Sequence, residues 1–241
     1  MKRNAYIGLV TLVLFLGVAG LVLREIAALP SGVAVSFQYN GSSNGTAAGS
    51  RNDSGGYIYV TNMDTLSQNQ NWKAYLGNVT GSFTLDDAQN RTIYNWELTV
   101  TGGEVYASRN STINWPGIVC ANEAHMESEN NYFGYSATQV DNINRSFNAT
   151  VHTQIKVGAV TITANTCNST FLFVNDTRQA TATASDFQEV VLSDGGNMVF
   201  AALIENNAYG FDNTTYDFQM IVPENGSSTT TNAYYFYAEI K

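Results

Sequence analysis

The chain has 241 residues and a formal net charge of −9 at pH 7, and only 13% of its residues are charged. The negative charge, with four lysines spread along the sequence and no basic cluster, argues against a nucleic-acid-binding protein. The 12% of aromatic residues argues against an intrinsically disordered chain.

The N-terminal end has the pattern of a membrane anchor. After Lys2 and Arg3, the segment Ala5–Leu23 contains neither a charge nor a proline. As a helix it would span about 28 Å, which matches the hydrocarbon core of a bilayer. The basic pair in front predicts a single-pass cell-membrane protein with its N-terminus inside and its C-terminal domain outside. We therefore assign residues 1–30 to a transmembrane anchor or uncleaved signal, with the lipid bilayer as partner.

Two alternative interpretations of this segment, both involving proteolytic processing, remain. An alanine-rich site near Ala27-Ala28, or at Ala34, would suit a cleaved signal peptide. Pilin-type processing ahead of the apolar helix would leave that helix as the core of a filament. The length and leucine content of the segment favour the retained anchor.

Acceptor signals for N-linked glycans are in excess. The pattern Asn-x-Ser/Thr occurs twelve times, where the composition predicts about five by chance. The acceptor positions are Asn40, Asn44, Asn52, Asn78, Asn90, Asn110, Asn144, Asn148, Asn168, Asn175, Asn213 and Asn225. An Asn- and Thr-rich turn composition is the alternative source of these signals. Since most of them fall in turns, we expect N-linked glycans, first at Asn44, Asn90, Asn213 and Asn225.

The two cysteines, Cys120 and Cys167, are expected to form a disulfide outside the cell. Two buried thiols are the alternative. A metal pair is disfavoured because neither cysteine belongs to a Cys-x-x-Cys motif.

Residues 31–56 read as an extended tether and loop. Val33–Tyr39 alternates like a strand, and the Gly/Ser/Asn-rich stretch Asn40–Gly56 follows it. A spacer of this length is uncommon inside one compact domain. Val33–Tyr39 is therefore predicted either to fold back onto its own sheet or to pair with a neighbouring subunit, which would give a homo-oligomer.

Residues 57–241 read as short strands separated by glycine-rich turns, with a helical insert at about 115–148. This spacing predicts a mainly β fold, a β-sandwich of the Ig-like or jelly-roll-like kind. The predicted strands are Tyr57–Met63, Trp72–Leu76, Val79–Leu85, Thr92–Val100, Glu104–Arg109, Val151–Val157, Val160–Ala164, Thr170–Val174, Phe187–Leu192, Met198–Glu205, Tyr216–Val222 and Ala233–Ile240. Asp194–Asn197 carries a hairpin signal.

Two local expectations follow from the pattern. Alternation in the strand at 92–100 predicts that Tyr94, Trp96 and Leu98 point inward, with Asn95 and Glu97 outward. In the insert, we expect a helix over Gly117–Asn130 that carries Cys120 and is capped by Asn114, and a short helix over Asp141–Phe147 capped by Asp141.

No catalytic signature is present. The chain has only two histidines, His125 and His152, and contains no nucleophile elbow, zinc-protease motif, P-loop or dinucleotide motif. We therefore assign no catalytic and no cofactor-binding residues, and we expect no cofactor.

The metal-ligand candidates are weak as well. The densest cluster is Cys120, Glu123, His125, Glu127 and Glu129, with His152 as an added ligand. Because residues two apart on a helix diverge by about 200°, we interpret it as a solvated helix face. Asp86-Asp87 with Asn90, and Asp212-Asn213, resemble calcium-loop fragments but match no EF-hand, so we interpret them as turns.

The aromatic run Tyr234–Tyr237 places rings on both faces of a terminal strand. Such rings can form a stacking platform for carbohydrate. The structural interpretation, a strand buried on one face and covered by a glycan or a neighbour on the other, is the favoured one.

Several runs resemble a recurrent, uncharacterised set of archaeal membrane-anchored, N-glycosylated surface proteins. These runs are Trp72–Gly81, Gly103–Arg109, Asn114-Trp115, Ile118–Cys120, Tyr216–Gly226 and Tyr234–Tyr237. The resemblance implies archaeal origin, membrane anchoring and a glycosylated surface, and it carries no activity. We therefore expect a non-catalytic structural or adhesive glycoprotein: an envelope coat, an attachment protein or a filament subunit. The alternative is an extracellular glycoside hydrolase or carbohydrate-binding module.

Overall fold

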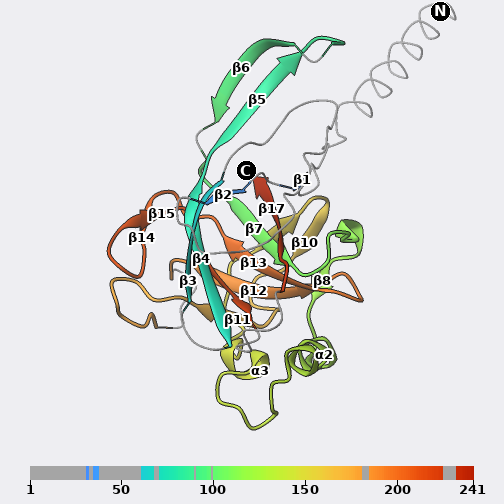
Figure 1. Cartoon of the computed structure of the whole chain (residues 1–241), viewed down its shortest axis with the longest axis vertical. Coiled ribbons are helices and arrows are strands. Elements are labelled where there is room, and N and C mark those ends of the chain that lie inside the picture. The colour runs from blue at the N-terminus through green and yellow to red at the C-terminus, as the bar shows by residue number, and fades with distance from the viewer. Residues whose placement is uncertain are drawn as a thin grey trace, which may run out of the picture.

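The computed structural model describes residues 31–32, 35–37, 61–67, 71–89, 91–98, 100–180, 185–224 and 232–241. This part of the chain is mainly β, with several sheets and two α-helices (Figure 1). The prediction of a mainly β fold is confirmed.

The largest sheet has seven strands, all antiparallel to their neighbours. Six of them follow in the order β1 (Ser31–Gly32), β17 (Tyr235–Ile240), β7 (Gly103–Ser108), β13 (Met198–Leu203), β12 (Gln188–Ser193) and β11 (Ser169–Phe171), and β8 (Val119–Cys120) pairs with β12. The predicted hairpin turn at Asp194–Asn197 joins β12 to β13, and the N–H of Asp194 donates to the carbonyl oxygen of Asn197 at 3.2 Å.

A second sheet of four strands contains β16 (Phe218–Pro223), β4 (Trp72–Val79), β3 (Thr61–Ser67) and β2 (Val35–Phe37), in that order. Three two-stranded ribbons complete the described strands: β5 (Gly81–Asp86) with β6 (Thr92–Leu98), β9 (Ile155–Val157) with β10 (Val160–Ile162), and β14 (Ala208–Tyr209) with β15 (Thr215–Tyr216).

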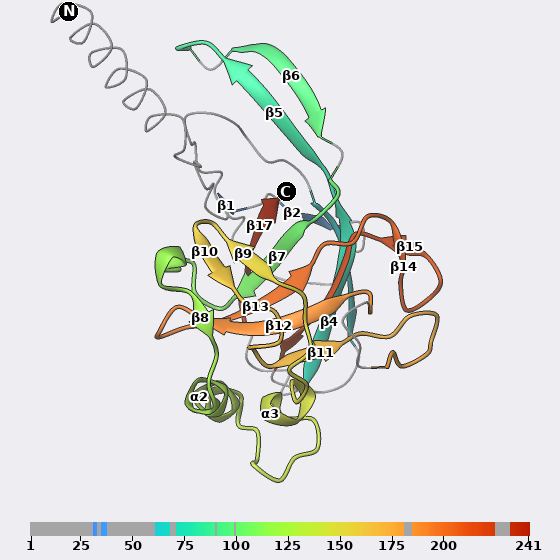
Figure 2. The same cartoon turned by 180° about the vertical axis from the view of Figure 1, so that it is seen from behind.

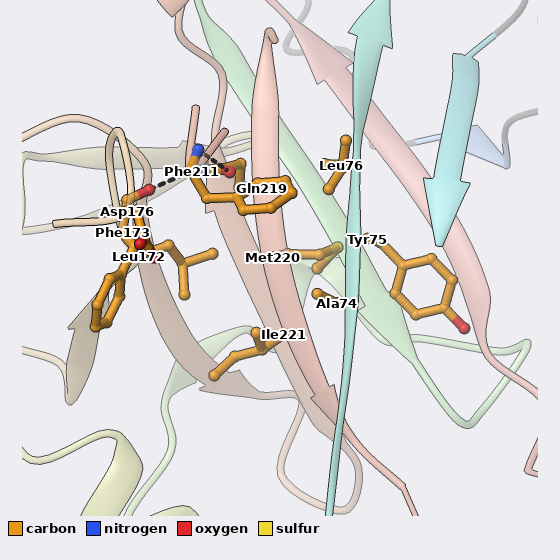
Figure 3. Close-up of a pocket in the computed structure, with 10 residues that line it drawn as sticks. All are labelled: Ala74, Tyr75, Leu76, Leu172, Phe173, Asp176, Phe211, Gln219, Met220 and Ile221. Atoms are coloured by element: carbon orange, nitrogen blue, oxygen red, sulfur yellow. Dashed lines mark hydrogen bonds between the residues drawn. The ribbon is translucent and has the colours of Figure 1, made fainter. Parts of the chain in front are cut away.

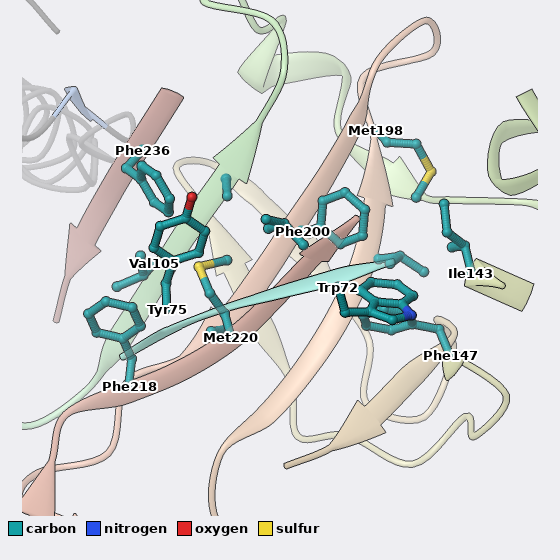
Figure 4. Close-up of a cluster of buried hydrophobic side chains, with 14 of the residues drawn as sticks. Trp72, Tyr75, Val105, Ile143, Phe147, Met198, Phe200, Phe218, Met220 and Phe236 are labelled. Atoms are coloured by element: carbon teal, nitrogen blue, oxygen red, sulfur yellow. The ribbon is translucent and has the colours of Figure 1, made fainter. Parts of the chain in front are cut away.

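The two larger sheets share one hydrophobic core (Figure 4). The large sheet contributes Val105 and Phe200, and the four-stranded sheet contributes Tyr75, Phe218 and Met220. In β16, alternate residues reach this core, as expected for a strand with one face turned inward. Each fully buried side chain of this size stabilises the fold by roughly 1.5–3 kcal/mol.

The opposite face of the large sheet is covered too. Tyr106, Val190 and Val199 pack there against the β9–β10 hairpin and against Trp115. Burial on both faces explains why all six residues of β13 are buried and apolar. A continuous apolar run of this kind is typical of a strand covered on both faces.

The helical insert differs in detail from the prediction. α2 spans Glu123–Phe133 and α3 spans Ile143–Ser146, and a 3₁₀ turn, η1 (Trp115–Gly117), precedes them. The helix predicted from Gly117 begins later because Asn122 caps it: its Oδ1 accepts the N–H of His125, and its own N–H donates to His125 Nδ1. Cys120 lies on strand β8 instead, and Asn142, not Asp141, caps α3.

The orientation predicted for Tyr94 is wrong. β6 is a strand, but its register pairs it only with β5, in a ribbon that stands away from the body in both views (Figures 1 and 2). Tyr94 is therefore 54% exposed, and Ile93, on the other face, is 65% exposed. The side chains of Asn95, Trp96, Glu97 and Leu98 lie outside what the structure describes.

At the N-terminal side, β2 pairs in parallel with β3 of the same chain, and β1 pairs with β17. Two arrangements were expected for Val33–Tyr39, and the structure has the one in which the segment folds back onto its own chain. The predicted anchor Ala5–Leu23 and the stretch Asn40–Gly56 lie outside the described residues. Within the described ranges, neither α2 nor α3 has the length and apolar character needed to cross a bilayer.

Candidate functional site

The predicted disulfide is formed. Cys120 on β8 bonds to Cys167, with their Cα atoms 5.0 Å apart. Since β8 lies beside β12, the bond ties the start of the helical insert to the loop that leads into β11.

His152 is buried beside this disulfide and has a structural role. Its Nε2 accepts the backbone N–H groups of Thr166 and Cys167 at 3.1 and 3.0 Å. Nε2 is therefore unprotonated, so Nδ1 carries the hydrogen and donates to the carbonyl oxygen of Thr153 at 2.6 Å. Both ring nitrogens are used to hold the loop around the disulfide.

The structure does not bring the metal-ligand candidates together. Cys120 is in the disulfide, and His125 Nδ1 accepts the N–H of Asn122, the residue that caps α2. Glu129 binds Arg109 through two hydrogen bonds of 2.6 and 2.7 Å. Glu123 and Glu127 are exposed on α2. Among the described residues, no three His, Cys, Asp or Glu side chains converge on a common point.

The calcium-loop fragments act as turns. Asp87 Oδ1 accepts the N–H groups of Gln89 and Arg91, and Asp212 Oδ1 accepts that of Thr214. Asn90 lies outside the described residues.

The structure contains a pair of opposed carboxylates that sequence reasoning did not identify. Glu104 on β7 and Glu239 on β17 are direct register partners, and both are buried. The hydroxyl of Tyr106 donates to both carboxylates, at 3.4 Å each. The spacing along the sequence could not reveal this pair because its members come from strands 135 residues apart.

The surroundings of the carboxylates hold them in place. Lys241 Nζ lies 2.6 Å from both oxygens of Glu104, and the N–H of Gly158 donates to Glu239 at 2.9 Å. Burial raises the pKa of Glu104 and that of Glu239, and their mutual repulsion adds to the rise at Glu104. The hydrogen bond from Gly158 to Glu239 therefore fastens the β9–β10 hairpin to the large sheet.

A third buried carboxyl group, that of Glu189 on β12, reaches between the two larger sheets. Its Oε2 accepts the N–H of Ile221 at 2.9 Å, and its Oε1 has no hydrogen-bond partner. Complete burial raises the pKa of Glu189 well above its ordinary value. Its hydrogen bond to Ile221 joins β12 of the large sheet to β16 of the four-stranded sheet.

A cavity of about 250 Å³ lies between β4, β16 and two loops (Figure 3). Its wall is mostly apolar and includes Leu172, Phe173, Phe211 and Ile221, with Asp176 as its only charged residue. Gln219 joins the loops to the sheet: its Oε1 accepts the N–H of Phe211, and its Nε2 donates to the carbonyl oxygen of Phe173.

Seven of the twelve glycan acceptor positions lie in the described residues. Five of these asparagines are exposed: Asn78, Asn110, Asn148, Asn175 and Asn213. Asn144 and Asn168 are partly buried, and their side chains form internal hydrogen bonds: Asn144 Oδ1 accepts from Asn130, and Asn168 Nδ2 donates to the carbonyl oxygen of Phe147. Asn40, Asn44, Asn52, Asn90 and Asn225 lie outside the described residues.

The aromatic terminal strand packs on both of its faces. Phe236 contacts Tyr75 in the core between the two larger sheets, with ring centroids 4.9 Å apart. Tyr237 contacts Trp115 on the other side at 5.0 Å. Phe236 thus lies on the buried face of the strand, as expected, and the ring that covers Tyr237 on the other face is Trp115 of the same chain.

Comparison with protein-family models, with curated proteins and with solved structures finds no match for this chain.

Proposed function

We propose that this chain is a membrane-anchored, N-glycosylated cell-surface protein with a structural or adhesive role and without catalysis. Its external part is a β-sandwich of the Ig-like or jelly-roll-like kind. Residues 1–30 hold it in the membrane with the N-terminus inside.

The exposure of the acceptor asparagines carries this proposal. A glycan must reach water, and five of the seven described acceptors lie on the surface. The disulfide adds support, because such bonds persist in oxidising surroundings outside the cytoplasm. The sequence resemblance to archaeal surface proteins agrees with both observations.

The test uses envelopes isolated from the native host. We expect the full chain to stay in the membrane after alkaline carbonate extraction, to carry glycans at several acceptors, and to be abundant in the envelope. Electron microscopy of the same envelopes would show a lattice, filament or surface projection. A soluble chain whose mature N-terminus is Ala34 or Val35, and whose mass is that of the bare polypeptide, would overturn the proposal.

A carbohydrate-binding module is the second candidate, and the cavity beside Phe173 favours it. The wall combines the aromatic residues Phe173 and Phe211 with the carboxylate of Asp176, a combination that suits the apolar face and the hydroxyl groups of a sugar. Calorimetric titration with envelope saccharides tests it. Binding that is lost in Asp176→Asn but kept in Glu123→Gln, an exposed control on α2, would favour this candidate.

A further inference from the structure

Two of the exposed glycan acceptors, Asn175 and Asn213, lie beside the cavity, and each follows an aromatic residue by two positions. Phe173 precedes Asn175, and Phe211 precedes Asn213. Both phenylalanines belong to the cavity wall. The other described acceptors have no aromatic residue two positions before them: Asn78, Asn110, Asn144, Asn148 and Asn168. Within the described part of the chain, this spacing of acceptor and aromatic ring therefore occurs at the cavity alone.

The turn that carries Asn175 is tight and is fixed to a neighbouring loop. Val174 and Thr177 exchange backbone hydrogen bonds of 3.0 and 2.9 Å. Between them, Asn175 and Asp176 both have positive φ, 46° and 53°. This is the geometry of a two-residue type I′ turn, which favours asparagine. The N–H of Asn175 donates to the carbonyl oxygen of Gly210 at 2.8 Å. The backbone of the acceptor is thereby held in one place beside the cavity wall.

Two aromatic rings near this turn are exposed. Phe173 is 47% exposed, and Figure 3 shows it on the loop side of the cavity, across from Leu76. Tyr209, which directly precedes Gly210, is 59% exposed. The two rings thus lie within two residues of the hydrogen bond between Asn175 and Gly210. Apolar rings that gather on a surface mark a place where another group packs.

A glycan on Asn175 has a short path to the ring of Phe173. Two residues of chain span at most about 7 Å, so the first sugar, which is joined to Nδ2 of Asn175, lies within reach of the ring. The C–H face of a sugar is apolar and packs on an aromatic ring, and its hydroxyl groups can donate to the carboxylate of Asp176. Covalent attachment keeps the sugar at a high effective concentration, so that a weak contact is sufficient.

We propose that the glycan at Asn175 is fixed against the fold, with its first sugar packed on the ring of Phe173, where it covers the loop side of the cavity. The proposal rests on the N-glycosylation proposed above, and it names the acceptor at which a glycan stabilises the chain. A consequence is that the ring of Phe173 is closed to free saccharides while the glycan is in place.

A double-mutant cycle on the full chain, purified from the native host, tests the proposal. It compares the unaltered chain with Phe173→Ser, Asn175→Asp and the double variant. Asn175→Asp removes the acceptor but keeps the turn, because aspartate also tolerates positive φ. We expect Phe173→Ser to lower the midpoint of thermal unfolding by about 2–4 °C more when the glycan at Asn175 is present than when it is absent, as for one aromatic contact in a chain of this size.

Asn148→Asp provides the matched control for loss of an acceptor. Asn148 is exposed, and its aromatic neighbour Phe147 is fully buried, so a glycan there has no adjacent ring on which to pack. Phe173→Ser should therefore lower the midpoint by the same amount with and without Asn148→Asp. A dependence on Asn148 as large as that on Asn175 would overturn the proposal, because the effect would then be a general one of glycan removal.

NMR of the glycosylated chain gives a second measurement that does not depend on unfolding. The ring current of Phe173 should shift protons of the first sugar at Asn175 upfield. In Phe173→Leu, which keeps an apolar side chain without a ring, these protons should move to the positions of a solvent-exposed sugar. Identical sugar shifts in the two chains would overturn the proposal.

Glycopeptide mass spectrometry of the same samples separates this inference from the proposed function. An occupied Asn175 with equal effects of Phe173→Ser in both backgrounds would overturn the inference and leave the glycosylation in place. A bare Asn175 would also overturn it, while glycans at other acceptors would still support the proposed function. Calorimetric binding of a free envelope saccharide to the glycosylated chain, lost in Phe173→Ser, would show that the ring is open and would overturn the inference as well.

Discussion

Asn175 and Asn213 donate their backbone N–H groups to the same acceptor, the carbonyl oxygen of Gly210, at 2.8 and 3.2 Å. Both asparagines have positive φ, 46° and 62°, and both are exposed. Asparagine tolerates this left-handed conformation better than most residues. Two acceptor sites 38 positions apart in the sequence are thus neighbours on one surface, beside the loops that form the cavity.

Glycan occupancy should follow this geometry. We expect glycans at Asn213 and Asn175, because their side chains are exposed at turns. Asn168 should remain bare, because its Nδ2, the atom to which a glycan is attached, donates to the carbonyl oxygen of Phe147 inside the fold. Glycopeptide mass spectrometry of the native protein measures both. Full occupancy at Asn168 with none at Asn213 would contradict the argument.

Removal of the disulfide should destabilise the chain. The bond joins residues 47 positions apart, so Cys120→Ala/Cys167→Ala should lower the free energy of unfolding by about 4 kcal/mol in the chain-entropy description. Denaturant unfolding of the variant measures the loss. Chemical reduction of the unaltered chain is the control and should produce a similar loss. Two free thiols in the unreduced native protein would show that the bond is not formed.

The sequence predicted the parts of this fold that depend on local signals. Turn residues, hydrophobic alternation and the presence of cysteine can each be read from a short stretch of sequence. These signals were enough to recognise the Asp194–Asn197 turn, most strands and the cysteine pair. The helix start was misplaced since Asn114 and Asn122 are both acceptable caps, and tertiary packing selects between them. Tyr94 was misjudged because alternation shows that a strand has an apolar face but not whether a second layer covers it.

The buried carboxylates could not be predicted for a related reason. Glu104, Glu189 and Glu239 look like ordinary solvent-facing residues of alternating strands. Their burial depends on a sheet that is covered on both faces, which follows from the packing of distant segments. Only the three-dimensional register reveals that Glu104 and Glu239 lie opposite each other.

The Glu104–Glu239 pair should make stability depend on pH. Burial raises both pKa values above the ordinary value of 4.5. As pH increases past 4.5, the unfolded chain loses these protons first while the folded chain retains them, so the free energy of unfolding falls until the folded groups ionise. The Glu239→Gln variant keeps an acceptor for the N–H of Gly158 but has no carboxyl group at this position. The part of the decrease in the free energy of unfolding that comes from Glu239 should therefore disappear in this variant.

Unfolding measured from pH 4.5 to 8 in the unaltered chain and in Glu239→Gln gives the comparison. Glu123→Gln, a change on the exposed face of α2, is the matched control and should retain the full decrease. Parallel pH profiles for the unaltered chain and Glu239→Gln would mean that the carboxyl group of Glu239 titrates alike in the folded and unfolded states.

Two adjacent glycines at the start of β7 should respond very differently to substitution. Gly103 has φ of 130°, and a Cβ atom there would overlap the backbone carbonyl oxygen of Glu239. A Cβ atom at Gly102 would have no atom within 4 Å. Gly103→Ala must therefore shift β7 away from β17 and should cost about 2–5 kcal/mol, from the strained backbone and the overlap together. Gly102→Ala should change stability by no more than about 1 kcal/mol. Thermal unfolding of the two variants compares the same chemical change at neighbouring positions. Equal stability of both variants would show that β7 and β17 are not in close contact at Gly103, and it would remove the register on which the Glu104–Glu239 pairing depends.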